Sequence, residues 1–258
     1  MNYIKEYIKY IFKSKGRHGT HSPFIFELVN ECLTANIDKK FLKQRKKLFK
    51  KLKTEEKTII IEDFGAGSKV LTNNRKIKDI FKIGSSKGKY GILLYKLNQH
   101  YKFNQILELG TSLGVGSFHL SKSNKNCKVT TVEGCSETFK IAKENLNKFD
   151  CKNVNLINER FDKFIQSHHH PIYDMVFIDG HHDGKALLNY IKMLEPFCHN
   201  DTFFILDDIR WSKSMLESWG KVKDSVEFNV SIDFFRMGIV LKRKQQEKEH
   251  FILKLKNQ

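Results

Sequence analysis

One stretch decides the fold of this chain, and it reads Glu108-Leu109-Gly110-Thr111-Ser112-Leu113-Gly114-Val115-Gly116. It combines an acidic residue, three glycines and two hydroxyl side chains. The apolar residues 105–107 before it favour a strand, and residues 117–120 after it begin a helical pattern, so the glycines fall in the turn between them. Because glycine has no Cβ, the backbone of such a turn can approach a ligand closely. The stretch therefore predicts a site for a nucleoside-bearing cofactor.

The order of the glycines separates two classes of cofactor. A dinucleotide-binding turn has the order G-x-G-x-x-G and places a pyrophosphate on a helix N-terminus. Here the order is G-x-x-x-G-x-G, and Glu108 comes two positions before the first glycine. A carboxylate there repels a pyrophosphate and suits a cationic, amine-bearing ligand. The pattern resembles motif I of the class I S-adenosylmethionine (SAM) dependent methyltransferases. The alternative is a glycine-rich turn without a ligand. The resemblance assigns these cofactor contacts: Glu108, Gly110, Thr111, Ser112 and Gly114.

A second acidic residue stands where a nucleoside site needs one. Residues 127–132 form a β-branched run that ends at Glu133 and Gly134, and an acidic side chain at the end of the second strand can accept both ribose hydroxyls. The alternative for Glu133 is an ordinary exposed carboxylate. After a predicted helix over 136–149 and a strand over 154–157, the chain passes through Arg160 and Phe161, in the loop that covers the adenine in the methyltransferase fold.

Two later strands also end in acid. Residues 173–178 and 202–206 are mainly apolar runs, typical of strands buried on both faces, and they end at Asp179 and at Asp207-Asp208. Open α/β sheets bind ligands at this edge, and crowded carboxylates need cations to neutralise them. The three acids suit Mg²⁺ or a similar divalent ion. They resemble the metal site of catechol-type O-methyltransferases, in which an acid follows the fourth strand and an acid-acid or acid-amide pair follows the fifth. This chain has Asp-Asp at the second place and not Asp-Asn. The alternative is that Asp179 faces the cofactor and Asp207 or Asp208 caps the next helix.

The resemblance extends over roughly residues 83–242. The segment that begins at Ile83-Gly84 is similar to the one that contacts the methionine part of the cofactor in catechol-type enzymes. Residues 226–230 and 232–241 resemble the antiparallel strand pair that closes methyltransferase sheets. The segments 18–24, 63–68 and 207–212 resemble a methyltransferase group common in Bacteroidetes.

The fold class implied is α/β: a doubly wound Rossmann-like sheet, mostly parallel with an antiparallel closing strand. The implied organisation is a mainly helical region 1–82 that covers the acceptor site, a SAM-binding domain 83–242 and a tail 243–258. Residues 3–12 and 22–33 predict two helices of the first region. The segment 16–21 between them suits either a lid or a connector. For 63–68 we expect a loop packed against the catalytic crevice.

Methyl transfer requires alignment of a nucleophile and, for a hydroxyl, removal of its proton. His181 follows Asp179 at a strand tip, where an imidazole titrates near neutrality, so it is the first candidate for the base, with His182 and Lys185 behind it. The alternative is that His181 is a surface residue. The expected function is O-methylation of a small molecule. A non-catalytic module that binds the cofactor is a further alternative.

Composition bounds the rest. A chain of 258 residues can bury one sizeable core. We expect a cytoplasmic protein without a membrane span, because no apolar run is long enough, and reduced thiols at its five cysteines. The net charge is +17, and the basic segment Lys39–Lys53 fits either RNA or a solvated helix face, which we prefer. The alternative function is therefore an RNA or protein methyltransferase that uses this basic segment. No pattern indicates the oligomeric state.

Overall fold

The computed structural model describes residues 3–14, 22–62, 74–84, 86–167 and 169–255. Two of the segments singled out in the sequence, 16–21 and 63–68, lie outside the described residues, and the predictions for them stay predictions. None of the described helices combines the length and the apolar composition that crossing a bilayer requires.

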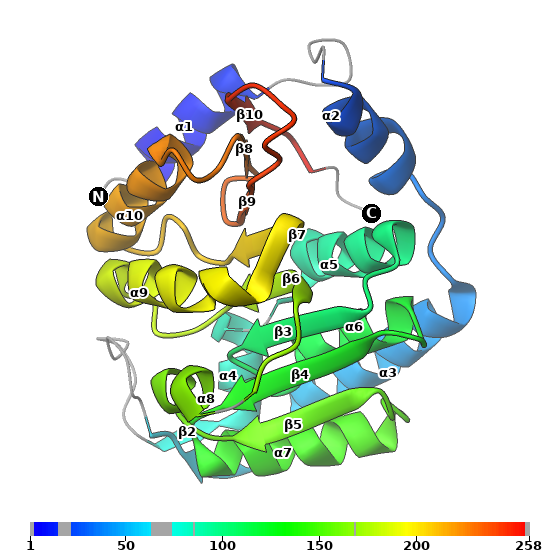
Figure 1. Cartoon of the computed structure of the whole chain (residues 1–258). Helices are drawn as coiled ribbons and strands as arrows, with labels where there is room; N and C mark the ends of the chain where they lie inside the picture. Colours follow the sequence, from blue (N-terminus) through cyan, green and yellow to red (C-terminus); the bar gives the residue numbers. More distant parts are fainter. Residues whose placement is uncertain (1–2, 15–21, 63–73, 85, 168, 256–258) are drawn as a thin grey trace.

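An eight-stranded mixed sheet forms the centre of the molecule, in the order β10-β8-β9-β7-β6-β3-β4-β5 (Figure 1). Strands β3 to β7 run parallel, and β9 lies antiparallel between β7 and β8. The predicted doubly wound sheet with an antiparallel closing pair is therefore confirmed. The strands are β3 (Gln105–Leu109), β4 (Lys128–Glu133), β5 (Val154–Asn158), β6 (Tyr173–Ile178), β7 (Cys198–Leu206), β8 (Val230–Asp233), β9 (Gly238–Leu241) and β10 (Glu249–Ile252).

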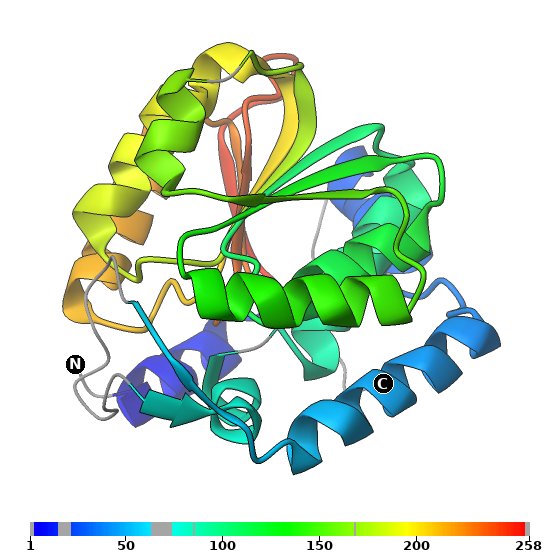
Figure 2. The ribbon, with the colours of Figure 1, turned by 90° about the horizontal axis from the view of Figure 1, so that it is seen from below.

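Helices cover both faces of this sheet (Figure 2). On one face, α9 packs between α8 and α10, and on the other α6 packs between α5 and α7. This arrangement follows from the right-handed connection between parallel neighbours. The helices are α5 (Gly88–Tyr101), α6 (Val115–Ser123), α7 (Ser136–Lys148), α8 (Phe161–Ser167), α9 (Gly184–Leu194), the short 3₁₀ helix η2 (Glu195–Phe197) and α10 (Lys213–Asp224).

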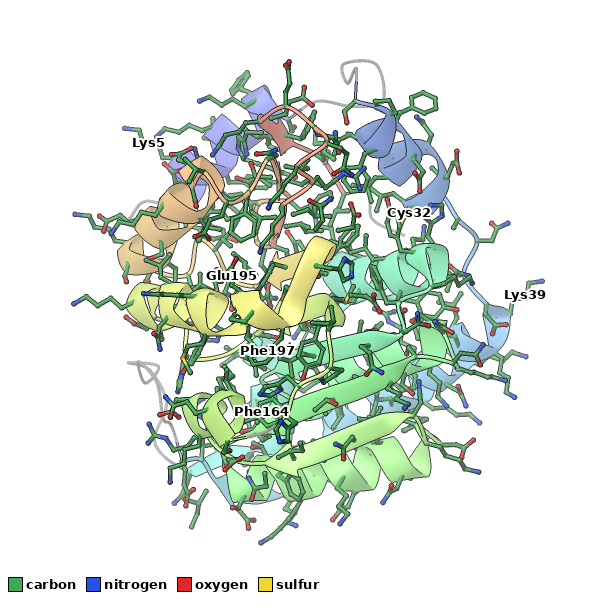
Figure 3. All side chains as sticks on the ribbon, in the orientation of Figure 1. Lys5, Cys32, Lys39, Phe164, Glu195 and Phe197 are labelled. Atoms are coloured by element: carbon green, nitrogen blue, oxygen red, sulfur yellow. The ribbon has the colours of Figure 1, made fainter. Side chains whose placement is uncertain are left out.

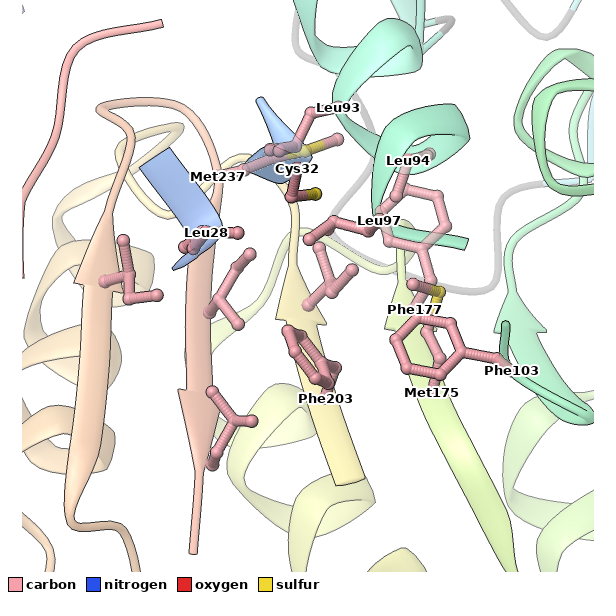
Figure 4. Close-up of a cluster of buried hydrophobic side chains, with 14 of the residues drawn as sticks. Leu28, Cys32, Leu93, Leu94, Leu97, Phe103, Met175, Phe177, Phe203 and Met237 are labelled. Carbon is pink, nitrogen blue, oxygen red and sulfur yellow. The ribbon is translucent and has the colours of Figure 1, made fainter. Parts of the chain in front are cut away.

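The hydrophobic core lies between the sheet and these helices. On the α5 face, Leu93, Leu94 and Leu97 pack over Phe177 of β6 and Phe203 of β7 (Figure 4). All five side chains are buried, which is why the apolar runs of the central strands carry no alternating polar residues.

The N-terminal region adds helices and a small hairpin around the sheet. Its elements are α1 (Tyr3–Lys13), α2 (Pro23–Glu27), the π-helical turn η1 (Leu28–Cys32), α3 (Lys39–Thr54), β1 (Thr58–Ile60), β2 (Asn74–Lys76) and α4 (Ile77–Gly84). On α3, Phe41, Leu48 and Leu52 are buried, whereas most of the lysines are exposed. One face of this basic helix therefore belongs to the core.

Two parts of the C-terminal region differ from the sequence analysis. Residues 226–229 form no strand, and the closing strand β8 begins only at Val230. Within the expected tail, β10 pairs in parallel with β8. Just beyond it, the Leu253 carbonyl accepts a hydrogen bond of 2.6 Å from the hydroxyl of Tyr10 on α1. Residues 249–253 are therefore part of the folded domain.

Candidate active site

The glycine-rich turn brings the end of β3 against the end of β6. Gly110 has φ +106°, and a Cβ at this position would lie 2.0 Å from the backbone oxygen of Asp179. The Gly110 amide donates to the Val132 carbonyl at 3.0 Å. Gly114, with φ +79°, is the N-cap residue that precedes α6. The turn therefore needs glycine at both positions, because each has a positive φ. At Gly110 a side chain would also collide with the backbone of Asp179.

Glu133 is held in place at the end of β4 by two backbone amides. Its Oε2 accepts from the Ser112 amide at 2.8 Å, and its Oε1 accepts from the Cys135 amide at 2.9 Å. Burial raises the pKa of this carboxyl, although the amide bonds counteract that effect. Each oxygen keeps lone-pair capacity for a further donor, such as a hydroxyl.

A cavity of about 220 Å³ opens at the carboxyl ends of the central strands, where the fold predicts a ligand. Most of the residues predicted to bind cofactor or to act in catalysis line it: Ile83, Gly84, Gly110, Ser112, Glu133, Gly134, Arg160, Phe161, Asp179, His181, His182 and Asp208. The sequence analysis did not assign a role to the following lining residues: Ile61, Glu62, Arg75, Ile80, Cys135, Thr138, Gly180 and Trp211. Glu62 and Arg75 flank the segment 63–73, which the structure does not describe.

Glu108 does not line this cavity. Its buried carboxylate faces α6, where it accepts hydrogen bonds from the hydroxyls of Ser117 and of Thr131, the latter at 2.7 Å. A Cβ at Gly116 would lie 2.1 Å from Glu108 Oε1, so that glycine makes room for the carboxylate. Burial raises the pKa of Glu108 to about 7. The expected contact between Glu108 and a cationic ligand stays a prediction, and the structure shows this carboxylate buried against α6.

Two other residues of the turn also lie outside the cavity lining. The Thr111 hydroxyl is buried and shares a hydrogen bond of 2.6 Å with Thr131, and Gly114 is the N-cap of α6. Both shape the turn and leave the cavity surface to Gly110 and Ser112.

Three side chains near the cavity form a group with metal-ligating atoms. One atom each from Asp179, His182 and Asp208 lie within 4.8 Å of one another, and the His182 Nδ1 is 3.5 Å from Asp208 Oδ2. Burial and the neighbouring Asp207 raise the pKa of Asp179 well above its usual range, and the same causes raise that of Asp208 to about 6. A cation in this group would relieve that cost.

Asp207, predicted as a metal ligand, is not part of this group. Both of its oxygens accept from Arg236, at 2.9 and 2.6 Å, and the side chain is buried. Arg236 Nε is also 2.9 Å from Asp208 Oδ1. Burial disfavours the guanidinium charge, but the adjacent aspartates overcome this and raise the pKa of Arg236. The predicted set of three acids is thus corrected to two acids and one imidazole, because both carboxylate oxygens of Asp207 are bound to Arg236.

The donor set of this group fits a divalent ion. Asp179 uses Oδ2 to accept from the Ser86 hydroxyl at 3.0 Å, and Asp208 uses Oδ1 for Arg236, so among the described residues each carboxylate keeps one oxygen for another ligand. Two carboxylate oxygens and one imidazole nitrogen suit Mn²⁺, Fe²⁺ or Zn²⁺ better than Mg²⁺, which prefers oxygen alone.

The candidate bases separate clearly. His181 lines the cavity, its Nδ1 shares a short hydrogen bond with the Tyr190 hydroxyl, and its ring lies 5.2 Å from that of Phe161. Lys185 is exposed on α9 and lies outside the cavity lining, so the expectation that it stands behind His181 as a base is not met. Three residues at this edge have a left-handed backbone conformation, which is uncommon for residues other than glycine: His181, His182 and Asp208, with φ of 62°, 31° and 52°.

Comparisons with known proteins agree with this geometry. A family model described as a methyltransferase domain matches residues 107–209. A search of curated proteins gives no match. Among solved structures, the chain is similar to an O-methyltransferase from Bacillus cereus in complex with SAH (TM-score 0.54, 18% identity, covering 62% of this chain and 84% of that one). It is also similar to the O-methyltransferase TomG from Streptomyces achromogenes, involved in tomaymycin synthesis and solved with SAM (TM-score 0.56, 14% identity, 84% and 95%).

A third similar structure is an SAH-bound methyltransferase from Podospora anserina (TM-score 0.58, 12% identity, 87% of this chain and 97% of that one). At these identities the likeness establishes the fold. The chain therefore has the class I methyltransferase fold, and its residues 107–209 match the methyltransferase-domain model.

Proposed function

We propose that this chain is an enzyme that transfers a methyl group from SAM to an oxygen atom of a small-molecule acceptor, assisted by a divalent ion. The observation that carries the proposal is that the glycine turn at Gly110, the pinned carboxylate of Glu133 and the group Asp179, His182 and Asp208 all meet at one cavity. The similar structures that bind SAM or SAH support the choice of cofactor.

The cofactor half of the cavity divides into three regions. Glu133 would accept the ribose hydroxyls with the lone pairs that its two amide bonds leave. Phe161 and Arg160, at the start of α8, would cover the adenine. Gly110 and Gly84 would border the amino-acid part, where backbone without side chains leaves room. Glu108 has a positioning role in this scheme, since it is buried beneath the first turn of α6.

The acceptor would bind on the side of the cavity that Trp211 and His182 line. Trp211 is 49% exposed there, and its ring lies 5.4 Å from that of His182, so an aromatic or other flat acceptor would find a stacking surface beside the metal-ligating group. Asp179, His182 and Asp208 would hold the ion. When bound, such an ion lowers the pKa of an acceptor hydroxyl.

His181 is the proposed base. A hydrogen bond between its Nδ1 and the Tyr190 hydroxyl, together with the contact with Phe161, fixes the direction of its imidazole at the cavity wall. With Nδ1 as the donor to Tyr190, Nε2 keeps the lone pair that a base needs. Burial raises the pKa of Tyr190 to about 12, so this phenol stays protonated at neutral pH and does not compete for the proton. The imidazole can then receive the acceptor proton as the methyl group moves to oxygen.

The test combines binding with turnover. Calorimetry with SAM should give a dissociation constant in the micromolar range expected of such sites. The protein is then incubated with methyl-labelled SAM and a cell extract, with and without EDTA, and the extract is separated into small molecules, RNA and protein. Label in the small-molecule fraction that EDTA suppresses supports the proposal. Label confined to RNA or protein would reject the acceptor class, and absence of SAM binding would reject the whole proposal.

A further inference from the structure

The N-terminal helix α1 exposes an apolar strip beside a row of lysines. Ile4, Ile8 and Phe12 follow one another at four-residue spacing and are 70%, 50% and 86% exposed. At helical geometry this spacing places them on one side of α1. Lys5, Lys9 and Lys13 follow with the same spacing, one residue later, and are exposed as well. Figure 3 shows Lys5 projecting outward from α1.

The opposite side of α1 holds the helix on the protein. Tyr3, Tyr7 and Tyr10 surround the ring of Phe235, with centroid distances of 5.0, 5.0 and 5.2 Å. The Tyr10 hydroxyl donates to the Leu253 carbonyl. The exposed strip is thus not needed to attach α1 to the rest of the molecule, and its large apolar side chains face water.

We propose that α1 docks the protein on an anionic phospholipid surface, with Ile4, Ile8 and Phe12 inserted at the level of the acyl boundary and Lys5, Lys9 and Lys13 at the phosphate level. Helices that lie in the membrane interface combine an apolar strip with adjacent basic residues in this way. The inference does not rest on the proposed enzymatic function.

Charge and area favour a lipid surface over a second copy of this chain. The chain has 46 basic and 29 acidic residues, so two copies repel each other, whereas an anionic bilayer attracts them. The exposed apolar side chains of α1 amount to roughly a few hundred Å², given about 150–250 Å² for one buried aromatic side chain. Each partner in a stable dimer buries about 800 Å².

The position of α1 gives the contact a consequence for the cavity. The ring of Tyr3 lies 5.0 Å from that of Phe235, and the next residue, Arg236, pairs with Asp208 at 2.9 Å, so the first turn of α1 lies near the metal-ligating group. Docking through α1 would therefore bring the cavity close to the lipid surface, where an amphiphilic acceptor would be concentrated.

The test is co-sedimentation of the full chain with vesicles. Vesicles of phosphatidylcholine with 30 mol% phosphatidylglycerol, a composition of roughly physiological surface charge, are compared with pure phosphatidylcholine. We expect binding to the anionic vesicles alone. The variant Ile4→Ser/Ile8→Ser/Phe12→Ser should lose it, whereas the matched variant Phe26→Ser/Ile172→Ser/Val226→Ser, which replaces exposed apolar residues elsewhere, should keep it.

A second pair of variants separates specific docking from general attraction by charge. Lys5→Glu/Lys9→Glu/Lys13→Glu should weaken binding about a hundredfold or more, since each basic residue near an anionic surface contributes roughly one tenfold step or slightly less. Lys40→Glu/Lys43→Glu/Lys47→Glu makes the same charge change on the exposed face of α3 and should bind much better. Equal losses in the two variants would overturn the proposal.

Light scattering after gel filtration tests the competing occupant. If the chain is a dimer that the variant Ile4→Ser/Ile8→Ser/Phe12→Ser converts to a monomer, the strip is an interface between two copies and the proposal is wrong. Far-ultraviolet circular dichroism and the thermal midpoint establish that each variant is folded. Absence of sedimentation with either kind of vesicle would also reject lipid docking, while leaving the enzymatic proposal untouched.

Discussion

Arg236 donates to both carboxylate oxygens of Asp207, from Nε at 2.9 Å and from Nη2 at 2.6 Å, beneath the edge of the sheet where the cavity opens. The same guanidinium reaches Asp208. One cation thus neutralises charge on two consecutive acids, of which one is buried as a structural residue and the other faces the cavity. This division explains how Asp207 and Asp208 can differ in role although they are neighbours.

Replacement of this cation should be strongly destabilising. Arg236→Gln leaves Asp207 buried without a counter-ion, and breaking a buried pair from one side costs about 3–5 kcal/mol of unfolding free energy. Lys213→Gln removes an exposed ion pair with Glu217 and should cost less than about 1 kcal/mol. Urea denaturation measures both. A loss of similar size in the two variants would contradict the structural role of the Asp207–Arg236 pair.

Substitution in the glycine turn should affect both stability and cofactor binding. In Gly110→Ala the new Cβ would lie 2.0 Å from the Asp179 carbonyl oxygen, and residue 110 has φ +106°, which alanine rarely adopts. The end of β3 must therefore move. We expect a loss of about 2 kcal/mol or more in unfolding free energy and of measurable SAM binding in calorimetry. Gly220→Ala, on α10 with no neighbouring atom within 4 Å, should be neutral or slightly stabilising. Unimpaired SAM binding by the Gly110 variant would remove this turn from the site.

The carboxylate at the end of β4 should account for a large share of the affinity for SAM. Glu133→Gln loses the charge that would receive the ribose hydroxyls and disturbs one of the bonds to the Ser112 and Cys135 amides. Hydrogen bonds to charged groups contribute about 1.5–3 kcal/mol, so the dissociation constant should rise roughly 10- to 150-fold. Glu144→Gln, exposed on α7, is the control. An unchanged dissociation constant would show that Glu133 does not contact the cofactor.

Metal binding should depend on His182 and not on a surface histidine. Titration with Mn²⁺, followed by calorimetry in the presence of SAM, should show a dissociation constant at least about tenfold higher for His182→Ala. His199→Ala removes a histidine that is paired with Asp174 at a distance of 3.1 Å and lies outside the group with metal-ligating atoms, so it should bind Mn²⁺ as the unmodified chain does. Equal binding by the two variants would contradict the assignment of His182 as a ligand.

The buried carboxyl of Glu108 should make stability depend on pH. Its pKa is raised from 4.5 to about 7, so the folded state holds a proton that the unfolded chain releases. The stabilising effect is complete below pH 4.5 and is lost as the pH rises to about 7, at roughly 1.4 kcal/mol per unit. Relative to Glu108→Gln, the unmodified chain should thus lose about 3 kcal/mol between pH 4.5 and 7. Parallel curves for the two proteins in urea denaturation would contradict the raised pKa.

The sequence predicted the fold well because its signals are local. The strand of residues 173–178 is apolar except for Asp174, and it forms β6 with the same bounds. The glycines and the acidic strand ends also come from short patterns, and most of the residues at the predicted edge do line one cavity. Strand β10 was missed because residues 249–252 are only partly apolar and gain their place by pairing with β8, some twenty residues earlier.

The errors at the site have a common physical origin. Whether an acid near a strand end faces the cavity or the opposite side depends on the direction of its side chain, which alternates along a strand and shifts with local backbone. Glu108 points toward α6, and the only hint in the sequence is Gly116, eight residues later, which leaves room for it. Asp207 is hydrogen-bonded to Arg236, a residue 29 positions later that lies in the closing hairpin. Such partners are not visible in a local pattern.

The hydrogen bond from Tyr10 to Leu253 joins residues 243 positions apart. Because α1 is synthesised long before residue 253, this contact can form only after the residues between them have left the ribosome. Until then the tyrosines of α1 also lack their contact with the ring of Phe235 and stay exposed to water. Attachment of α1 to the domain is therefore a late step of folding, because it depends on Phe235 and Leu253.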